Sequence, residues 1–164
     1  MSEVAVRPMT RSDLPAVGRL GAELARYHHE LDPERFLFTG NLQQAQEGYA
    51  HFFATELNDP RVVLLVAARE PPGDVVGYAY GRLEPRDWNM LLDAHGALHD
   101  VLVDESARAT GVGELLVRAV CRRLEALGAA RVVLHTAVQN ERAQALFARV
   151  GFRKTMFEMT RERE

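Results

Sequence analysis

Residues 108–113 read Arg-Ala-Thr-Gly-Val-Gly and lie between a strand-like segment and a long helical segment. The first turn of a helix offers backbone N–H groups that have no intrahelical acceptor, together with about half a positive charge. Gly111 and Gly113 would let the oxygens of a ligand approach this backbone without meeting a Cβ atom. The stretch therefore indicates either a pyrophosphate site at a helix start or a glycine-eased turn into the helix.

Two other phosphate-binding loops do not fit the letters. The chain has no G-x-G-x-x-G after a strand and no Gly-Lys-Ser or Gly-Lys-Thr. Neither a Rossmann dinucleotide site nor a nucleoside triphosphatase loop is therefore predicted. A pyrophosphate at this helix would belong to another carrier.

The segments around the loop alternate between strand and helix patterns. Hydrophobic spacing predicts strands over 62–68, 75–83 and 97–103, a helix from Gly111 that closes at Gly128, and a strand over 131–138. A strand, a helix and a strand in that order imply a right-handed parallel crossover. The first two strands are expected to pair antiparallel.

The rest of the chain completes a mixed α/β pattern. It predicts a strand over 4–8, a helix over 14–31 with Thr10 or Ser12 as N-cap, a helix over 42–57, a helix from Asn140 to Val150, and a last strand over 152–160. The polar segment 84–96 is expected to be a connecting loop.

Length and composition limit the domain organisation and the partners. A chain of 164 residues with 47% hydrophobic content is expected to form a single domain over 1–164. A net charge of −3 argues against nucleic acid as a partner, and no apolar stretch is long enough to span a membrane. Cys121 stands alone, so no intramolecular disulfide can form, and a cytoplasmic setting is expected.

Two spaced motifs give the chain a family resemblance. Residues 108–113 fit the signature RxxGxG or RxxGxA, and Asn140, Ala143, Gly151 and Phe152 fit a second signature, Asn-x-x-Ala-x-x-x-Tyr-x-x-x-Gly-Phe. The chain therefore resembles the GNAT superfamily of N-acetyltransferases that use acyl-coenzyme A. The resemblance implies a central mixed, mostly antiparallel sheet with a parallel β-α-β core that binds acetyl-coenzyme A.

The resemblance also assigns a binding site for acetyl-coenzyme A. The backbone N–H groups of 109–114 would hold the pyrophosphate, and the peptide-like pantetheine arm would add to the strand at 101–103. Arg108 would contact phosphate or remain a surface arginine, and Asn140 would contact the arm or serve only as a helix cap. The residues of this expected site are Val101, Leu102, Val103, Arg108, Ala109, Thr110, Gly111, Val112, Gly113, Glu114, Asn140, Ala143 and Phe147.

Acetyl transfer to an amine requires a base more than an acid. An alkylamine with a pKa of about 10.4 is neutral only about once in 2,500 molecules at pH 7, a deficit of about 4.6 kcal/mol, whereas a thiol is a fair leaving group unaided. The family often places a base nine residues before the signature arginine, and His99 has that place here. Imidazole can accept a proton near neutrality. Without the motif, His99 would be a half-buried strand histidine with satisfied hydrogen bonds.

Other residues near the expected centre have two interpretations each. Glu84 is a second candidate for the base or for binding the amine, or it is an exposed residue at a strand end. Asp100 is expected to face away from His99, because side chains alternate along a strand. The acceptor pocket could be lined by Tyr78, Tyr80, Trp88 and His95.

Phe147 departs from the family pattern, which commonly has a tyrosine proposed to protonate the coenzyme A sulfur. The absence of this tyrosine should slow turnover rather than abolish it. Phe147 could pack against the thioester or belong to the core. The expected function is acetyl transfer from acetyl-coenzyme A to a primary amine by direct attack. Two alternatives are a coenzyme A binding module that is weak or inactive as a catalyst, and a protein N-acetyltransferase.

The histidines do not indicate a metal site. His28 and His29 are adjacent on a helix and point apart, and His95 and His99 lack a third ligand. No metal is therefore expected. A homodimer is implied by the family resemblance alone.

Overall fold

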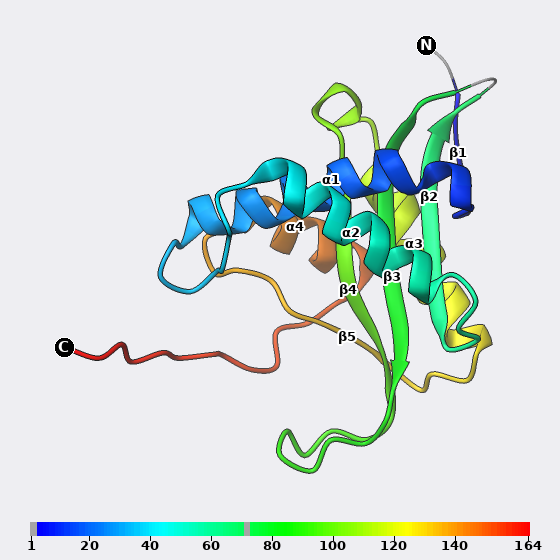
Figure 1. Ribbon diagram of the computed structural model, residues 1–164. Helices are drawn as coiled ribbons and strands as arrows, with labels where there is room; N and C mark the ends of the chain where they lie inside the picture. The colour runs from blue at the N-terminus through cyan, green and yellow to red at the C-terminus, as the bar shows by residue number, and fades with distance from the viewer. Residues whose placement is uncertain (1–2, 71–72) are drawn as a thin grey trace.

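The computed structural model describes residues 3–70 and 73–164, which form one mixed sheet covered by helices (Figure 1). The strands are β1 (Val4–Pro8), β2 (Val62–Arg69), β3 (Val75–Glu84), β4 (His95–Val103) and β5 (Val132–Leu134). The α-helices are α1 (Leu14–Leu31), α2 (Leu42–Glu56), α3 (Val112–Ala126) and α4 (Glu141–Val150). Short 3₁₀ turns occur at Arg11–Asp13 and Glu105–Ala107. None of the described helices is long and apolar enough to cross a membrane.

The strands lie in the order β1-β2-β3-β4-β5. The first four pair antiparallel, and β4 pairs with β5 in parallel. Helix α3 connects the parallel pair, as the strand-helix-strand pattern predicts. The mixed, mostly antiparallel sheet with a parallel β-α-β unit is confirmed.

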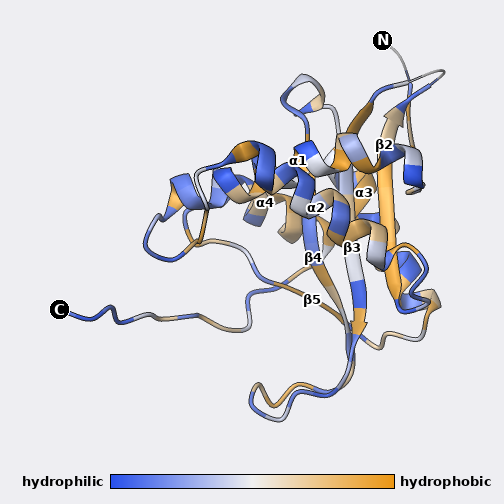
Figure 2. Cartoon of the chain, viewed as in Figure 1, coloured by the Kyte–Doolittle hydropathy of each residue, from blue (hydrophilic) through white to orange (hydrophobic). Residues whose placement is uncertain are grey.

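Both faces of the sheet are buried. In β2, Val63 and Leu65 join a core cluster with α3, whereas Leu64 and Val66 join a second cluster with α1 and α2. Figure 2 shows β2 as hydrophobic along its length, as expected for a strand covered on two sides. The helices α1 and α2 therefore form one layer over the sheet, and α3 covers the opposite face.

Helix α3 packs closely on β3 because small residues face it. A Cβ atom at Gly81 would lie 2.9 Å from Cγ1 of Val120, so a larger side chain there would push the helix away. The predicted apolar stripe of α3 is buried in part, since Leu115 and Leu127 are exposed. Its buried members are Val112, Leu116, Val117, Val120 and Leu124.

A β-bulge interrupts the pairing of β3 and β4. Tyr80 lies opposite Asp100, but the next pair is Gly81 with Leu98, so His99 is an extra residue in β4. The pairing of β4 with β5 runs only from Gly96 to Leu98 and stops where the bulge begins. A bulge bends its strand and increases the local twist, which accounts for the early separation of the parallel pair.

The first turn before α1 is held by a buried carboxylate. Asp13 accepts two hydrogen bonds of 2.8 Å from the guanidinium of Arg7 and one of 2.8 Å from the backbone N–H of Thr10. Thr10 therefore begins the 3₁₀ turn, as one of the two predicted capping residues, while α1 itself starts after Asp13.

Two predictions for the C-terminal third are wrong. Strand β5 covers only Val132–Leu134 instead of 131–138, because its partner strand turns away at the bulge. Residues 152–160 are not a strand: from residue 153 onward no backbone hydrogen bond joins the segment to the rest of the described chain. Figure 1 shows this segment extending away from the sheet. Alternation of side chains does not by itself supply the backbone hydrogen bonds to a neighbouring strand that a β-strand requires, and this segment makes none within the described chain.

Candidate active site

The separation of β4 from β5 leaves one edge of β4 without a strand partner. Beyond Leu98, the residues Val101, Leu102 and Val103 pair only with β3, through Ala79, Tyr78 and Gly77. The backbone of this part of β4 is available to an extended ligand on the β5 side. Val101 and Val103 pack their side chains into the core beside α3, which fixes the strand in place.

The loop that precedes α3 carries a row of free backbone donors. Within the described residues, none of the backbone N–H groups of 109–114 has an acceptor, and regular bonding resumes with Leu115, which donates to the carbonyl of Gly111. Ala109 and Gly111 have φ angles of 61° and 87°, in the left-handed region. Alternating backbone conformations of this kind turn successive N–H groups toward one side and form an anion-binding concavity.

Side chains of the loop hold it against the end of β4. The Nε of Arg108 donates to the carbonyl oxygen of Val103 at 3.1 Å, and Oγ1 of Thr110 donates to the carbonyl oxygen of Ala107 at 2.6 Å. No atom lies within 4 Å of a Cβ built at Gly111, so the space before the helix is open. The free donors, the left-handed backbone and this open space fit a pyrophosphate, and the unpaired edge of β4 fits a pantetheine arm.

Helix α4 lies beside the start of α3, where a Cβ atom at Gly113 would be 3.3 Å from Leu146 of α4. The Oδ1 of Asn140 accepts a hydrogen bond of 3.2 Å from the backbone N–H of Ala143 and so caps the helix. Phe147 is 8% exposed and packs against Phe152, with 6.0 Å between ring centroids. The structure thus places Asn140 in its capping role and Phe147 in the core.

His99 and Glu84 lie in contact. The Nε2 of His99 is 2.9 Å from Oε1 of Glu84, and the imidazole stacks on the ring of Tyr80 with 5.2 Å between centroids. The His99 side chain keeps 41% of its surface exposed, so it remains accessible. If Nε2 carries the proton and donates it to Glu84, then Nδ1 is left as an acceptor.

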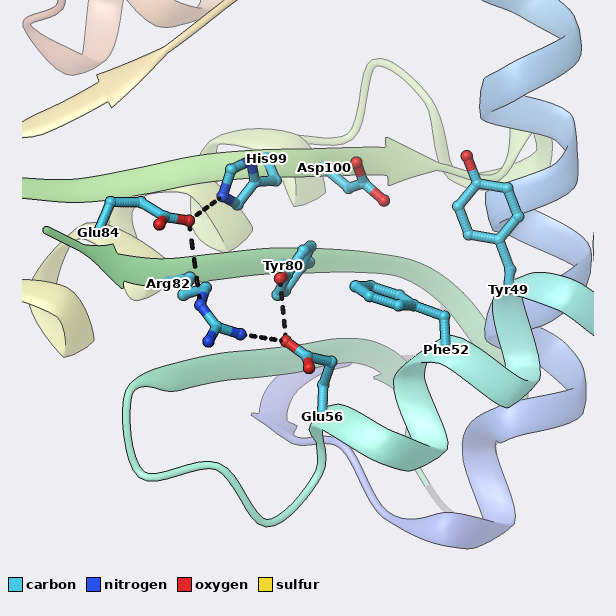
Figure 3. A pocket seen from close by; sticks show the side chains of 8 residues that line it. All are labelled: Tyr49, Phe52, Glu56, Tyr80, Arg82, Glu84, His99 and Asp100. Atoms are coloured by element: carbon cyan, nitrogen blue, oxygen red, sulfur yellow. Dashed lines mark hydrogen bonds and ion pairs between the residues drawn. The ribbon is translucent and has the colours of Figure 1, made fainter. Parts of the chain in front are cut away.

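These two residues belong to an open pocket of about 500 Å³ between α2 and the strands β3 and β4 (Figure 3). Its lining consists of aromatic side chains, carboxylates, a guanidinium and the imidazole. The lining residues are Tyr49, Phe52, Glu56, Tyr80, Arg82, Glu84, His99 and Asp100.

Arg82 is occupied by carboxylates. Its guanidinium nitrogens lie 2.6 Å from Glu56 and 3.2 Å from Asp59, and its Nε is 4.0 Å from Glu84. The hydroxyl of Tyr80 also donates to Glu56, at 3.1 Å. Burial raises the pKa of Tyr80 to about 12, so the phenol stays protonated at neutral pH.

The prediction that Asp100 faces away from His99, drawn from strand alternation, is wrong. Because His99 is the extra residue at the bulge, both His99 and Asp100 face the α2 side and line the same pocket. The hydroxyl of the fully buried Tyr78 donates to Oδ2 of Asp100 at 3.0 Å. Burial raises the pKa of the Asp100 carboxyl above its ordinary value.

Of the four residues expected to line an acceptor pocket, only Tyr80 does so. Tyr78 lies beneath the pocket, where it contacts Asp100. Trp88 is 73% exposed in the loop between β3 and β4, under the guanidinium of Arg86. His95 is buried, with Nδ1 bonded to the carbonyl of Asp93 at 2.9 Å.

The residues of α2 were missed by sequence reasoning. Tyr49, Phe52 and Glu56 follow one another by three and four residues, which puts them on one face of the helix. That spacing was a signal, but it is equally typical of a helix that packs on a core. Within the described chain, no three His, Cys, Asp or Glu side chains form a group that could hold a metal ion.

Comparison with known proteins gives a family match over most of the chain. The model of the acetyltransferase (GNAT) family matches residues 24–152. A mycothiol acetyltransferase of Kocuria rhizophila is 30% identical over 123 residues, covering 74% of this chain and 38% of that protein. A glucosamine 6-phosphate N-acetyltransferase of Trypanosoma brucei brucei is 29% identical over 92 residues, covering 56% of this chain and 60% of that protein. The chain thus spans less than two thirds of the length of each of these relatives.

The fold has close structural neighbours. The crystal structure of a tetramutant of the BH1408 protein from Bacillus halodurans superimposes with a TM-score of 0.77 at 22% identity, covering 96% of this chain and 99% of that one. At this identity the similarity concerns the fold.

Proposed function

Because the chain belongs to the GNAT acetyltransferase family, we propose that it transfers the acetyl group of acetyl-coenzyme A to a primary amine bound beside His99. The observation that carries this proposal is the position of His99. It lies in an open pocket, bonded to Glu84, on the strand whose free edge begins at the same bulge. A proton acceptor and a cleft for an acyl carrier are therefore adjacent.

The chain's own residues supply the binding of the acyl donor. The N–H groups of 109–114 donate to the pyrophosphate at the start of α3, where the helix dipole also favours negative charge. The pantetheine amides bond to the free edge of β4 at 101–103. Arg108, tied to the carbonyl of Val103, keeps two guanidinium nitrogens for phosphate. Asn140, Ala143 and Phe147 lie on the α4 side of the cleft.

His99 and Glu84 act on the amine. Glu84 holds the imidazole by its Nε2, and Nδ1 takes a proton from the acceptor's ammonium, directly or through water. The neutral nitrogen attacks the thioester carbonyl, the C–N bond forms and the C–S bond breaks. The attacking nitrogen loses its second proton to solvent as the amide forms, and the sulfur leaves as a thiolate that takes up a proton from solvent, since Phe147 has none to donate.

The test is the release of free thiol from acetyl-coenzyme A on addition of amines. A panel should contain small amines, polyamines and lysine peptides, so that it separates small-molecule from protein acceptors. Thiol release that depends on one class of amine is the expected result. A parallel measurement of the melting temperature with acetyl-coenzyme A reports binding without catalysis.

Phe147 favours one alternative, a module that binds coenzyme A without efficient transfer. That reading predicts a raised melting temperature with acetyl-coenzyme A and no thiol release with any amine. Phe147→Tyr, which returns the missing proton donor, should then bring back thiol release. If transfer occurs in the wild type, the alternative is rejected.

A further inference from the structure

We infer that the acceptor is a cationic amine with an apolar, ring-sized body and no anionic group, and that Asp100 is the residue that binds its ammonium. The inference rests on the proposed function and names the acceptor class of the same site. It comes from the charges and the walls of the pocket between α2 and the strands β3 and β4.

The pocket has more negative than positive groups, and one carboxylate is left without a countercharge. Glu56 and Glu84 share Arg82, and Glu84 also contacts His99. Asp100 forms no ion pair with any residue of the described chain and accepts only a neutral phenol hydrogen bond from Tyr78. Burying a carboxylate without a cation is unfavourable, and a bound ammonium would remove that cost.

The walls of the pocket suit an apolar body. Phe52 and Tyr80 meet edge to face with 5.6 Å between ring centroids, and Tyr49 stands beside them on α2. In Figure 3, Tyr49 and Phe52 lie on α2, Tyr80 lies on β3 between Phe52 and His99, and His99 and Asp100 follow one another along β4. Aromatic faces also attract cations. An amine whose ring contacts Phe52 would therefore place its nitrogen toward β4.

The bulge explains why one ammonium can use both residues of β4. Asp100 and His99 are adjacent in sequence yet face the same side, which regular alternation would forbid. An ammonium held by Asp100 thus lies beside the imidazole that takes its proton. Asp100 binds the charged form of the acceptor, and His99 generates the neutral form.

An anionic acceptor would find no free cation. Arg82 is the only arginine or lysine among the lining residues of the described chain, and it is already shared by Glu56, Asp59 and Glu84. A phosphate or carboxylate on the acceptor would instead face three carboxylates of the pocket. The relative named for glucosamine 6-phosphate therefore differs from this chain in acceptor class.

The first experiment compares acceptors that share one body. 2-Phenylethylamine and phenylalanine differ by a carboxylate, and phenylalaninamide has similar bulk without the charge. We expect kcat/KM for phenylethylamine and phenylalaninamide to exceed that for phenylalanine at least tenfold, with glucosamine 6-phosphate as poor as phenylalanine. Equal rates for phenylalanine and phenylethylamine would overturn the inference.

The second experiment removes the charge of Asp100. Asp100→Asn should raise KM for phenylethylamine at least tenfold with a smaller change in kcat, and should narrow the difference between phenylethylamine and phenylalanine. Tyr78→Phe keeps the carboxylate of Asp100 and should retain the preference for phenylethylamine over phenylalanine. Glu125→Gln, an exposed charge change on α3 across the sheet, is the matched control.

The measurements distinguish a failure of the proposed acetyl transfer from a failure of the inference about the acceptor and Asp100. Acetyl-coenzyme A should raise the melting temperature of every variant, which shows that each folds and binds the acyl donor. An unchanged KM in Asp100→Asn refutes the role of Asp100 while the proposed transfer stands. If no amine releases thiol from a chain that binds acetyl-coenzyme A, the proposed function fails and the acceptor class fails with it.

Discussion

His99 and Glu84 are fifteen residues apart in sequence, and their side chains meet because β3 and β4 pair antiparallel across a short connection. Sequence alone selected both residues, His99 from its distance to Arg108 and Glu84 from its place at a strand end. Sequence reasoning could not select Asp100, because no residue near it in the sequence indicates the β-bulge that places this side chain in the pocket. The partners on α2 were hidden for a different reason, because an aromatic helix face predicts core packing as well as a ligand wall.

Replacing the base tests the chemistry at this scale. His99→Ala should lower kcat/KM by about 10²–10⁴-fold, the usual contribution of a general base, and should remove the fall in activity on the acid side of the pH profile. Glu84→Gln should give a smaller loss, because the imidazole keeps a hydrogen-bond partner. Steady-state kinetics from pH 5 to 9 measure both effects. An unchanged profile would remove His99 from the mechanism, and His51→Ala, an exposed histidine of α2, is the control.

Asp13 makes the free energy of unfolding depend on pH in the acid range. Hydrogen bonds from Arg7 lower its pKa to about 2 from an ordinary 3.8, so the ionised form is favoured in the folded state. Its contribution, on the order of 2 kcal/mol, is present above pH 4 and is lost as the pH falls toward 2. Asp13→Asn should therefore be less stable than the wild type at pH 7 and nearly equal to it at pH 2. Urea unfolding at several pH values measures this, and a difference that does not change with pH would contradict it.

The elements differ in how far sequence could predict them. Helix α3 was predicted from its apolar stripe and its flanking glycines, and both its start and its end agree with the structure within two residues. β5 and the segment 152–160 were overpredicted, because an alternating pattern shows what a strand could be, not whether its backbone pairs with a neighbouring strand. The parallel pair was correctly placed, but its early separation depends on the bulge in β4.

The role of the loop before α3 in binding acetyl-coenzyme A can be tested by replacing two glycines. Both have left-handed φ angles, but they lie at opposite ends of the helix. Gly111→Ala forces a side chain into the left-handed region at φ 87° and should cost about 1–2 kcal/mol of stability. It should also weaken the binding of acetyl-coenzyme A, because its methyl group enters the open space before the helix. Calorimetric titration measures the affinity.

Gly128→Ala is the matched control, with φ 102° just after the other end of α3 and equally open surroundings. It should lose comparable stability and bind acetyl-coenzyme A as the wild type does. Equal affinities in both variants would mean that the loop before α3 does not hold the pyrophosphate.

For the whole molecule, the two core layers account for the fold, and the C-terminal segment contributes little to them. Residues 154–164 are exposed, and their contact with the body is an ion pair between Arg35 and Glu158. Met156, Phe157 and Met159 are also exposed, at 65%, 79% and 91%. The position of this segment followed from no pattern in the sequence.

Removing residues 154–164 should leave the melting temperature of the single chain within about 2 °C, because almost no apolar surface is uncovered. Thermal unfolding and light scattering should be measured together. A large loss of stability, accompanied by a fall in molecular mass, would contradict this expectation and would mean that the segment packs on a second copy of the chain.

The extra residue in β4, His99, lies outside the alternation that places the core side chains of this strand. If His99 were deleted, Leu98, Asp100 and Val101 would still alternate between the two faces, and every core side chain of the strand would keep its place. The deletion would also let the ladder with β5 continue past Leu98 and close the cleft. One extra residue in β4 thus supplies both the imidazole that we propose as the base and the free strand edge beside it, without a change in the core.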